Sequence, residues 1–171
     1  MKFVVLMIAI TMFLTGCDEE AANIKKFPSF VAKDLNGREF SNTIFKDVDV
    51  TAVVILKLDS QICINLLSKL CTLREINNTQ IITLTVDKNV SELSADYSND
   101  FVNLIVNDDF NELLLNIHNV PTTIFVDSEC NIIGQAVIGD NVDLIHHEMM
   151  HLLEINSPDS KNLKFIQDKI F

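Results

Sequence analysis

The sequence has little glycine, proline, positive charge or large aromatic surface. Only 4 of its 171 residues are Gly and 3 are Pro, which is too few for a low-complexity chain, and 48% are hydrophobic, which is too many for a disordered one. The 24 acidic residues outnumber the 13 basic ones and give a net charge of -11. This balance argues against nucleic-acid binding, which needs a basic surface. There is no Trp and one Tyr, but 11 Phe can build the core of one domain.

A long apolar run occurs only at the start of the chain. Residues 3–14 are too few to span a bilayer and fit the core of a signal peptide. The run ends in Leu14-Thr15-Gly16-Cys17, which resembles a bacterial lipobox. The resemblance implies cleavage before Cys17 and a lipid on its sulfur, so that the protein is anchored to a cell membrane and faces the periplasm or the cell surface. We therefore expect a signal peptide over 1–16, a lipidated tether over 17–26, a main domain over 27–156 and a C-terminal extension over 157–171.

The remaining hydrophobic pattern predicts strands that alternate with helices. Strands are expected at 51–58, 81–86, 101–106, 122–126 and 132–137. Helices are expected at 62–76, 90–97, 109–118 and 142–155. Early alternation implies parallel strands joined by helical crossovers, and the late hairpin adds antiparallel strands. The pattern therefore predicts an α/β fold, with a mixed central sheet and helices on both faces.

Two segments resemble the thioredoxin-like superfamily, especially its membrane-anchored TlpA/redoxin-type thiol–disulfide oxidoreductases. V-P-T-T-I-F-V-D at 120–127 is similar to a V-P-T-T-hydrophobic-hydrophobic-Asp segment of that family. Residues 30–40, with Asp34-Leu35-Asn36-Gly37 as a turn, are similar to its entry segment. The resemblance covers about residues 27–156 and implies a thioredoxin-like fold. It also implies that a cis peptide bond precedes Pro121 and that this residue lies against the redox cysteines.

The family's C-x-x-C motif is incomplete in this chain. In the family, the first Cys sits at the start of the helix after the first core strand, where backbone dipoles stabilise a thiolate. The corresponding stretch holds only Cys63. If Cys63 is the attacking thiol, its partner position is Leu66; if it is the second Cys, the first position is Ser60. We favour the attacking position, because a loop through residue 60 leaves Cys63 at the start of the helix, and both alignments stay open.

The other cysteines do not complete a motif. Cys71 follows Cys63 by two helical turns, a rise of about 12 Å, which is too far for a disulfide. It is expected to be a small thiol in the core or on the helix surface. Cys130 falls in the predicted hairpin turn and is expected to be an exposed free thiol. Nothing in the pattern indicates that Cys130 approaches Cys63.

A second motif, H-E-M-M-H at 147–151, matches the H-E-x-x-H pattern of zinc peptidases. On a helix, His147 and His151 lie opposite the apolar face, and no third ligand follows them. We expect a solvent-facing polar surface, with His147 and His151 as weak metal-ligand candidates and a zinc metallopeptidase as a remote alternative. Elsewhere, Asp108 and Asp109 are expected to cap a helix, and Asp127 to fix a turn.

The leading function hypothesis is a lipid-anchored monothiol redox protein outside the cytoplasm. Cys63 would attack a disulfide or be oxidised, Pro121 would shape the groove beside it, and a thiol from elsewhere would resolve the mixed disulfide. The alternative is a redox-inactive binding module with a thioredoxin-like fold. A peroxiredoxin is disfavoured because Leu56 replaces the Pro of that family's motif. We expect no cofactor, attachment to the membrane through the lipid, an unidentified protein thiol or disulfide as partner, and no nucleic acid.

Overall fold

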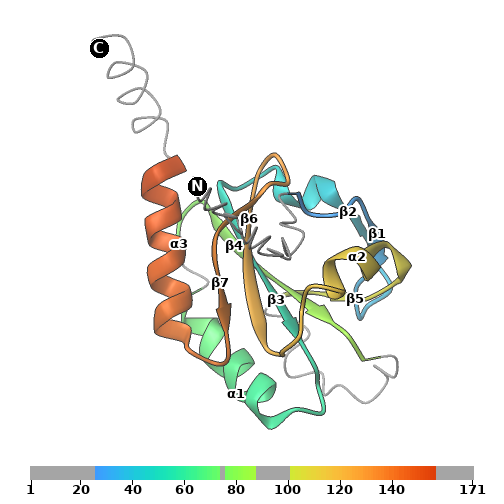
Figure 1. The fold of residues 1–171 in the computed structure, drawn as a ribbon. Helices are drawn as coiled ribbons and strands as arrows, with labels where there is room; N and C mark the ends of the chain where they lie inside the picture. Colours follow the sequence, from blue (N-terminus) through green and yellow to red (C-terminus); the bar gives the residue numbers. More distant parts are fainter. Residues whose placement is uncertain (1–25, 74–75, 88–100, 157–171) are drawn as a thin grey trace, which may run out of the picture.

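A computed structural model describes residues 26–73, 76–87 and 101–156 (Figure 1). The expected signal peptide, the lipidation site Cys17, the helix expected at 90–97 and the C-terminal extension lie outside the described residues. Within the described part of the chain, no helix is long and apolar enough to span a membrane.

The described core is built on a five-stranded mixed sheet. Its strands are β3 (Val50–Leu56), β4 (Thr79–Thr85), β5 (Val102–Ile105), β6 (Thr122–Asp127) and β7 (Ile132–Ile138), in the order β5-β4-β3-β6-β7. β3 is parallel to β4 and antiparallel to β6. Every residue of β3 is buried, as expected for a central strand covered on both faces. The predicted mixed sheet is therefore present.

Helices cover both faces of this sheet (Figure 1). One face packs against α1 (Gln61–Leu70), the short 3-10 helix η2 (Cys71–Leu73) and α3 (Val142–Asn156). The other face packs against the 3-10 helices η1 (Asn42–Phe45) and η3 (Asp108–Phe110) and against α2 (Asn111–Leu114). Alternate residues of β3 face the two layers, so that Val54 joins the first core and Ile55 the second. The sheet therefore separates two apolar cores.

A two-stranded hairpin, β1 (Val31–Lys33) and β2 (Glu39–Ser41), precedes the sheet. Its turn is the predicted one: Gly37 has a φ of +78°, its N–H donates to the Asp34 carbonyl at 2.9 Å, and the Asp34 N–H donates to the Arg38 carbonyl at 2.8 Å. This is the pattern of a turn closed by a glycine bulge.

The helix predicted over 109–118 is shorter than the sequence suggested. A 3-10 turn runs into α2, which ends at Leu114. The predicted cap is also wrong, because the Asn107 side chain caps this turn by accepting from Asp109 N at 3.1 Å. The carboxylate of Asp109 instead accepts from Val31 N at 3.0 Å, so it joins β1 of the hairpin to η3. Helical periodicity alone does not reveal this tertiary contact.

Candidate functional site

The site suggested by the sequence lies where β3 ends and α1 begins. Residues 57–60 connect the two elements, and Ser60 occupies the N-cap position before the first helical residue, Gln61. The Ser60 carbonyl accepts from Ile64 N at 3.0 Å, but the Ser60 side chain makes no capping hydrogen bond. Ser60 is half-buried, and Ile62 beside it is 53% exposed. The surface at this helix start is therefore a serine hydroxyl beside an exposed apolar side chain.

Cys63 lies in the first turn of the same helix, below the surface that Ser60 and Ile62 form. The helix starts two residues before Cys63, so its side chain faces the core that α1 and α3 share, and it is 0% exposed. The Lys57 N–H donates to the Cys63 sulfur at 3.4 Å. The loop runs through residue 60 and the helix begins at Gln61, close to the expected start, but the Cys63 side chain is buried and not at the surface. This burial fits the other alignment better, in which Ser60 holds the first position and Cys63 the second.

Pro121 lies at the same end of the sheet. The Val120–Pro121 peptide bond is cis, as the resemblance implied. Thr122 of β6 pairs with Ile55 of β3, so Pro121 is level with the last residue of β3, next to the loop that leads to α1. The Pro121 carbonyl accepts from Gly139 N at 2.9 Å, and the Thr122 hydroxyl donates to the Asn119 carbonyl at 2.7 Å. These bonds fix the backbone on both sides of the proline.

Two further groups near this end were not identified from the sequence. Asp87, just after β4, accepts from Leu58 N at 2.6 Å and so anchors the loop between β3 and α1. An acidic residue at the end of a predicted strand was the only available signal. The Thr123 hydroxyl is fully buried and has no hydrogen-bond partner among the described residues. Thr123 pairs with Val54, so it faces the same core as Cys63.

The remaining cysteines lie apart from Cys63. Cys130 packs at the edge of the opposite core, so the sheet separates it from Cys63. It was expected to be exposed but is half-buried, because its sulfur packs near Asn42, 3.8 Å from the side-chain nitrogen. Both Cys63 and Cys130 are free thiols. Cys71 is half-buried at the border of the first core, and its sulfur lies 3.7 Å from the Leu67 carbonyl oxygen, consistent with the predicted small packing thiol.

The histidine motif lies on α3, away from this end of the sheet. His147 and His151 are exposed, whereas Ile145 and Met149 are buried, as the helical spacing predicted. The Glu148 carboxylate accepts from Gln135 N of β7 at 2.8 Å, so the acid of the motif is engaged in a structural contact. No group of three or more metal-ligating side chains gathers within the described ranges. The arrangement therefore offers no built zinc site there.

Asp127 has the role that the sequence predicted. Its carboxylate accepts from Glu129 N at 2.9 Å and from Asn131 N at 2.8 Å, which closes the turn between β6 and β7. Cys130 lies in this turn with a φ of +65°. The acid is therefore a structural group and not part of the site at Ser60.

Comparison with known proteins gives the fold. No protein-family model matches the chain, and no curated protein matches it in sequence. Among solved structures, it is similar to a candidate thioredoxin from Neisseria meningitidis, with a TM-score of 0.64 and 18% identity over 79% of this chain and 93% of that one. A candidate thiol:disulfide interchange protein DsbE from Chlorobium tepidum has a TM-score of 0.61 and 12% identity over 75% and 96%.

An exposed lipoprotein thioredoxin from Streptococcus pneumoniae is also similar, with a TM-score of 0.54 and 16% identity over 74% of this chain and 98% of that one. At these identities the likeness concerns the fold. The mixed sheet, the cis proline at the start of β6 and the helix after β3 agree with it. The chain therefore has a thioredoxin-like fold.

Proposed function

We propose that this chain is a lipid-anchored, extracytoplasmic binding module that uses the thioredoxin-like surface around Ser60, Ile62 and Pro121 and does not carry out dithiol exchange. The observation that carries the proposal is the burial of Cys63 beneath a helix start at which Ser60 replaces the attacking thiol. A thiolate must reach a disulfide sulfur to exchange with it, and a hydroxyl does not substitute for it in that reaction.

The surface at this point suits a protein partner. Ile62 is a large apolar side chain left half in solvent, and the half-buried Leu58 and Val120 lie at the same end of the sheet. The hydrogen bonds to Asp87 and to the Pro121 carbonyl hold the surrounding loops in place. A preformed surface of this kind can bind a partner with little ordering cost.

A monothiol redox protein is the second candidate, and the position of the Cys63 sulfur favours it, because this sulfur accepts from Lys57 N in the loop between β3 and α1. In this reaction the Cys63 thiolate attacks one sulfur of a partner's disulfide. A bond forms between the two sulfurs, and the other partner sulfur leaves as a thiolate. A second thiol, from a small-molecule thiol or another protein, then attacks the mixed disulfide and releases Cys63. The helix start must open for this to occur.

A variant with an added thiol at the helix start distinguishes the binding module from the monothiol redox protein. The natural chain should not reduce a protein disulfide such as that of insulin, whereas Ser60→Cys should gain this activity, because an attacking thiol would then stand three residues before Cys63. Leu66→Cys is the matched control: it also places two cysteines three residues apart, but Leu66 is 0% exposed. Disulfide reduction by the natural chain would contradict the binding module, and a gain with Leu66→Cys instead would favour the other alignment.

The lipid anchor has its own test. Cys17→Ala should abolish incorporation of a labelled fatty acid and release the protein from the membrane fraction, whereas Cys130→Ala should change neither. Retention of the label in Cys17→Ala would contradict lipidation at Cys17 while leaving the proposal for the Ser60 surface intact.

A further inference from the structure

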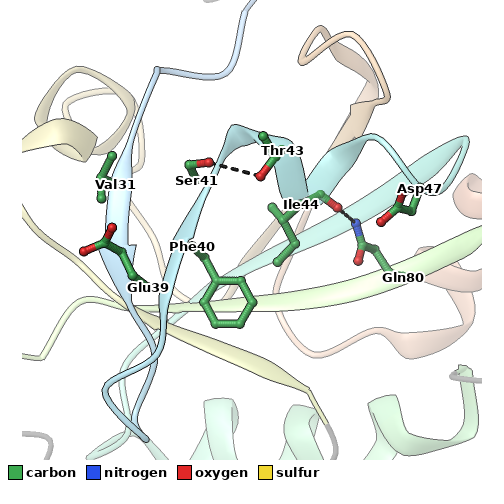
Figure 2. Close-up of a pocket in the computed structure, with 8 residues that line it drawn as sticks. All are labelled: Val31, Glu39, Phe40, Ser41, Thr43, Ile44, Asp47 and Gln80. Carbon is green, nitrogen blue, oxygen red and sulfur yellow. Dashed lines mark hydrogen bonds between the residues drawn. The ribbon is translucent and has the colours of Figure 1, made fainter.

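A groove lies along β2, and Val31 of β1 also contributes to its lining. It has a volume of about 480 Å³. Figure 2 shows the side chains around it, which come from the hairpin, η1, the loop that follows η1 and the start of β4. The apolar part of the lining is formed by Phe40 and Ile44. Gln80 is held in place by bonds from its side-chain nitrogen to the Ile44 carbonyl at 2.6 Å and to the Thr51 hydroxyl at 2.9 Å.

The groove is remote from the surface proposed above. Gln80 pairs beside Thr51 at the start of β3, whereas Ser60 follows the end of that strand. Strands rise by about 3.3 Å per residue, so the two ends of β3 are about 20 Å apart. The groove also borders the second core, and Cys63 belongs to the first. A ligand in the groove would therefore not contact Cys63.

β2 is a sheet edge within the described residues. β1 pairs with it on one side and is itself joined to the main sheet through a bridge between Asp34 and Leu104. The bond from Asp34 N to the Arg38 carbonyl marks a hydrogen-bonded pair. In an antiparallel ladder, hydrogen-bonded pairs alternate with non-hydrogen-bonded pairs. The backbone of Phe40, two residues after Arg38, is therefore hydrogen-bonded to β1. The N–H and C=O groups of Glu39 and Ser41 point away from β1, toward the groove.

The groove has an acidic lining, with two cations beside it: Lys33 is opposite Glu39 in the hairpin register, and the Arg38 guanidinium carbon lies 5.7 Å from the Phe40 ring centroid. The carboxylates of Glu39 and Asp47 line it, and no lysine or arginine does. Among the described residues, ion pairs join only Arg38 to Asp34 and Lys69 to Asp140, so neither groove carboxylate is neutralised by one. An exposed strand edge with free backbone groups is a template for an added strand, and a cross-strand partner of opposite charge strengthens such pairing.

We infer that the β2 edge binds an extended, basic segment of another protein by β-strand addition. The backbone of this segment pairs with Glu39 and Ser41. Its lysine or arginine side chains lie near Glu39 and Asp47, and its apolar side chains lie over Phe40 and Ile44. Main-chain bonds supply affinity in this mode, and the alternating side chains supply specificity. A second copy of β2 would bring Glu39 close to another Glu39, so charge disfavours self-pairing.

The test uses the full chain and a ten-residue probe peptide in which Lys alternates with Val and Thr. Hydrogen exchange is followed amide by amide. At saturation the peptide should slow exchange at Glu39 and Ser41 by about tenfold or more, since both N–H groups become hydrogen-bonded. Two control peptides should leave both amides unprotected: one with Glu in place of Lys, and one with N-methyl groups on every backbone amide, which blocks both edges of the strand. Equal protection by either control, or protection only near Ile62 and Pro121, would overturn the inference.

Matched variants distinguish an effect of the groove carboxylates on peptide binding from an effect of the protein's net charge. The double variant Glu39→Lys, Asp47→Lys should weaken binding of the Lys peptide about tenfold or more. The double variant Glu39→Gln, Asp47→Asn keeps the shape of both side chains and removes only their charge, so it should weaken binding less. The control, Asp143→Lys with Glu154→Lys, makes the same charge change on the exposed face of α3 and should bind as the natural chain does. Equal loss in the control pair would show that net charge alone attracts the peptide, and would overturn the inference.

Discussion

Ser60 and Cys63 stand three residues apart in opposite surroundings. One residue is at the solvent end of the helix, and the other is sealed in the core. The sequence identified both positions but not which of them faces solvent. That depends on the residue at which the helix begins, and helix boundaries shift by one or two residues without changing the apolar pattern. The helix begins at Gln61, one residue before the expected start, and the Cys63 side chain in its first turn faces the core.

Thr122 and Thr123 provide a matched pair of predictions at this scale. Both hydroxyls are buried, but among the residues that the structure describes only that of Thr122 has a partner, the Asn119 carbonyl. Thr123→Val should raise the free energy of unfolding by about 1 kcal/mol, because an unsatisfied buried hydroxyl is removed at constant shape. Thr122→Val should lower it by about 1 kcal/mol through the lost bond.

Urea unfolding of the three proteins measures both values. The opposite signs are the expected result. Destabilisation by Thr123→Val comparable to that of Thr122→Val would mean that the Thr123 hydroxyl has a partner, such as a buried water, and would contradict the assignment.

The hairpin is the element whose stability depends most clearly on pH. Burial acts to raise the pKa of Asp34, but hydrogen bonds from Arg38 and from Asn36 N, together with the charge of Arg38, outweigh it and lower the pKa below its usual value. The ion pair with Arg38 spans 2.7 Å, and Asp34 is 2% exposed. A carboxyl whose pKa is lowered by folding stabilises the folded state above the unfolded pKa, about 3.9, and this contribution is lost as the pH falls through the folded value.

Asp34→Asn should therefore destabilise the protein by about 1–2 kcal/mol at pH 7 through the loss of charge-assisted bonds. The difference from the natural chain should shrink below about pH 4, where Asp34 of the unfolded chain becomes protonated, and should continue to shrink until the folded carboxyl is protonated at its lowered pKa. Urea unfolding at a series of pH values measures the difference. A difference that stays constant down to pH 2 would show that the ionised form of Asp34 is not what stabilises the hairpin.

The pairing of β6 with β7 shifts register between Thr123 and Phe125, which leaves a bulge in β7 that contains Gly134. Gly134 has a φ of +64°, and a Cβ there would overlap the Glu148 carboxylate oxygen that accepts from Gln135 N. It would also lie 2.9 Å from a Leu152 methyl carbon. Gly134→Ala should thus cost about 2–3 kcal/mol, combining backbone strain with loss of this contact.

Gly37→Ala is the control for this position, because its φ of +78° imposes a similar backbone strain but its Cβ would meet nothing within 4 Å. It should cost only about 1 kcal/mol. Thermal or urea unfolding compares the two variants. Equal losses would show that packing between β7 and α3 does not depend on the glycine.

At the scale of elements, apolar periodicity predicted the strands well and short helices poorly. The continuous apolar run at β3 and the turn at Gly37 need no long-range information, since burial on both faces and a positive φ each restrict residue type locally. The end of α2 and the role of Asp109 depend on the hairpin packing against them. Contacts between segments distant in sequence leave no periodic signal along either one.

The whole molecule combines a thioredoxin-like fold with a helix start at which Ser60 is half-buried and Cys63 is fully buried. The order of elements and the V-P-T-T segment were sufficient to predict this fold, and the solved structures agree with it. The activity was harder to predict, because it depends on the exposure of one sulfur. The groove beside β2 had no sequence signal either, since it forms only where β2, η1 and the start of β4 meet.

The most direct measurement is the rate at which Cys63 reacts with iodoacetamide in the folded protein. The chain would start at Asp18 and carry Cys71→Ser and Cys130→Ser, so that Cys63 is its only thiol. Because Cys63 is 0% exposed, its alkylation should be at least about a thousandfold slower than in urea, with the rate limited by opening of the fold. Alkylation of the folded protein at a rate comparable to that in urea would contradict the binding module and support a monothiol redox protein.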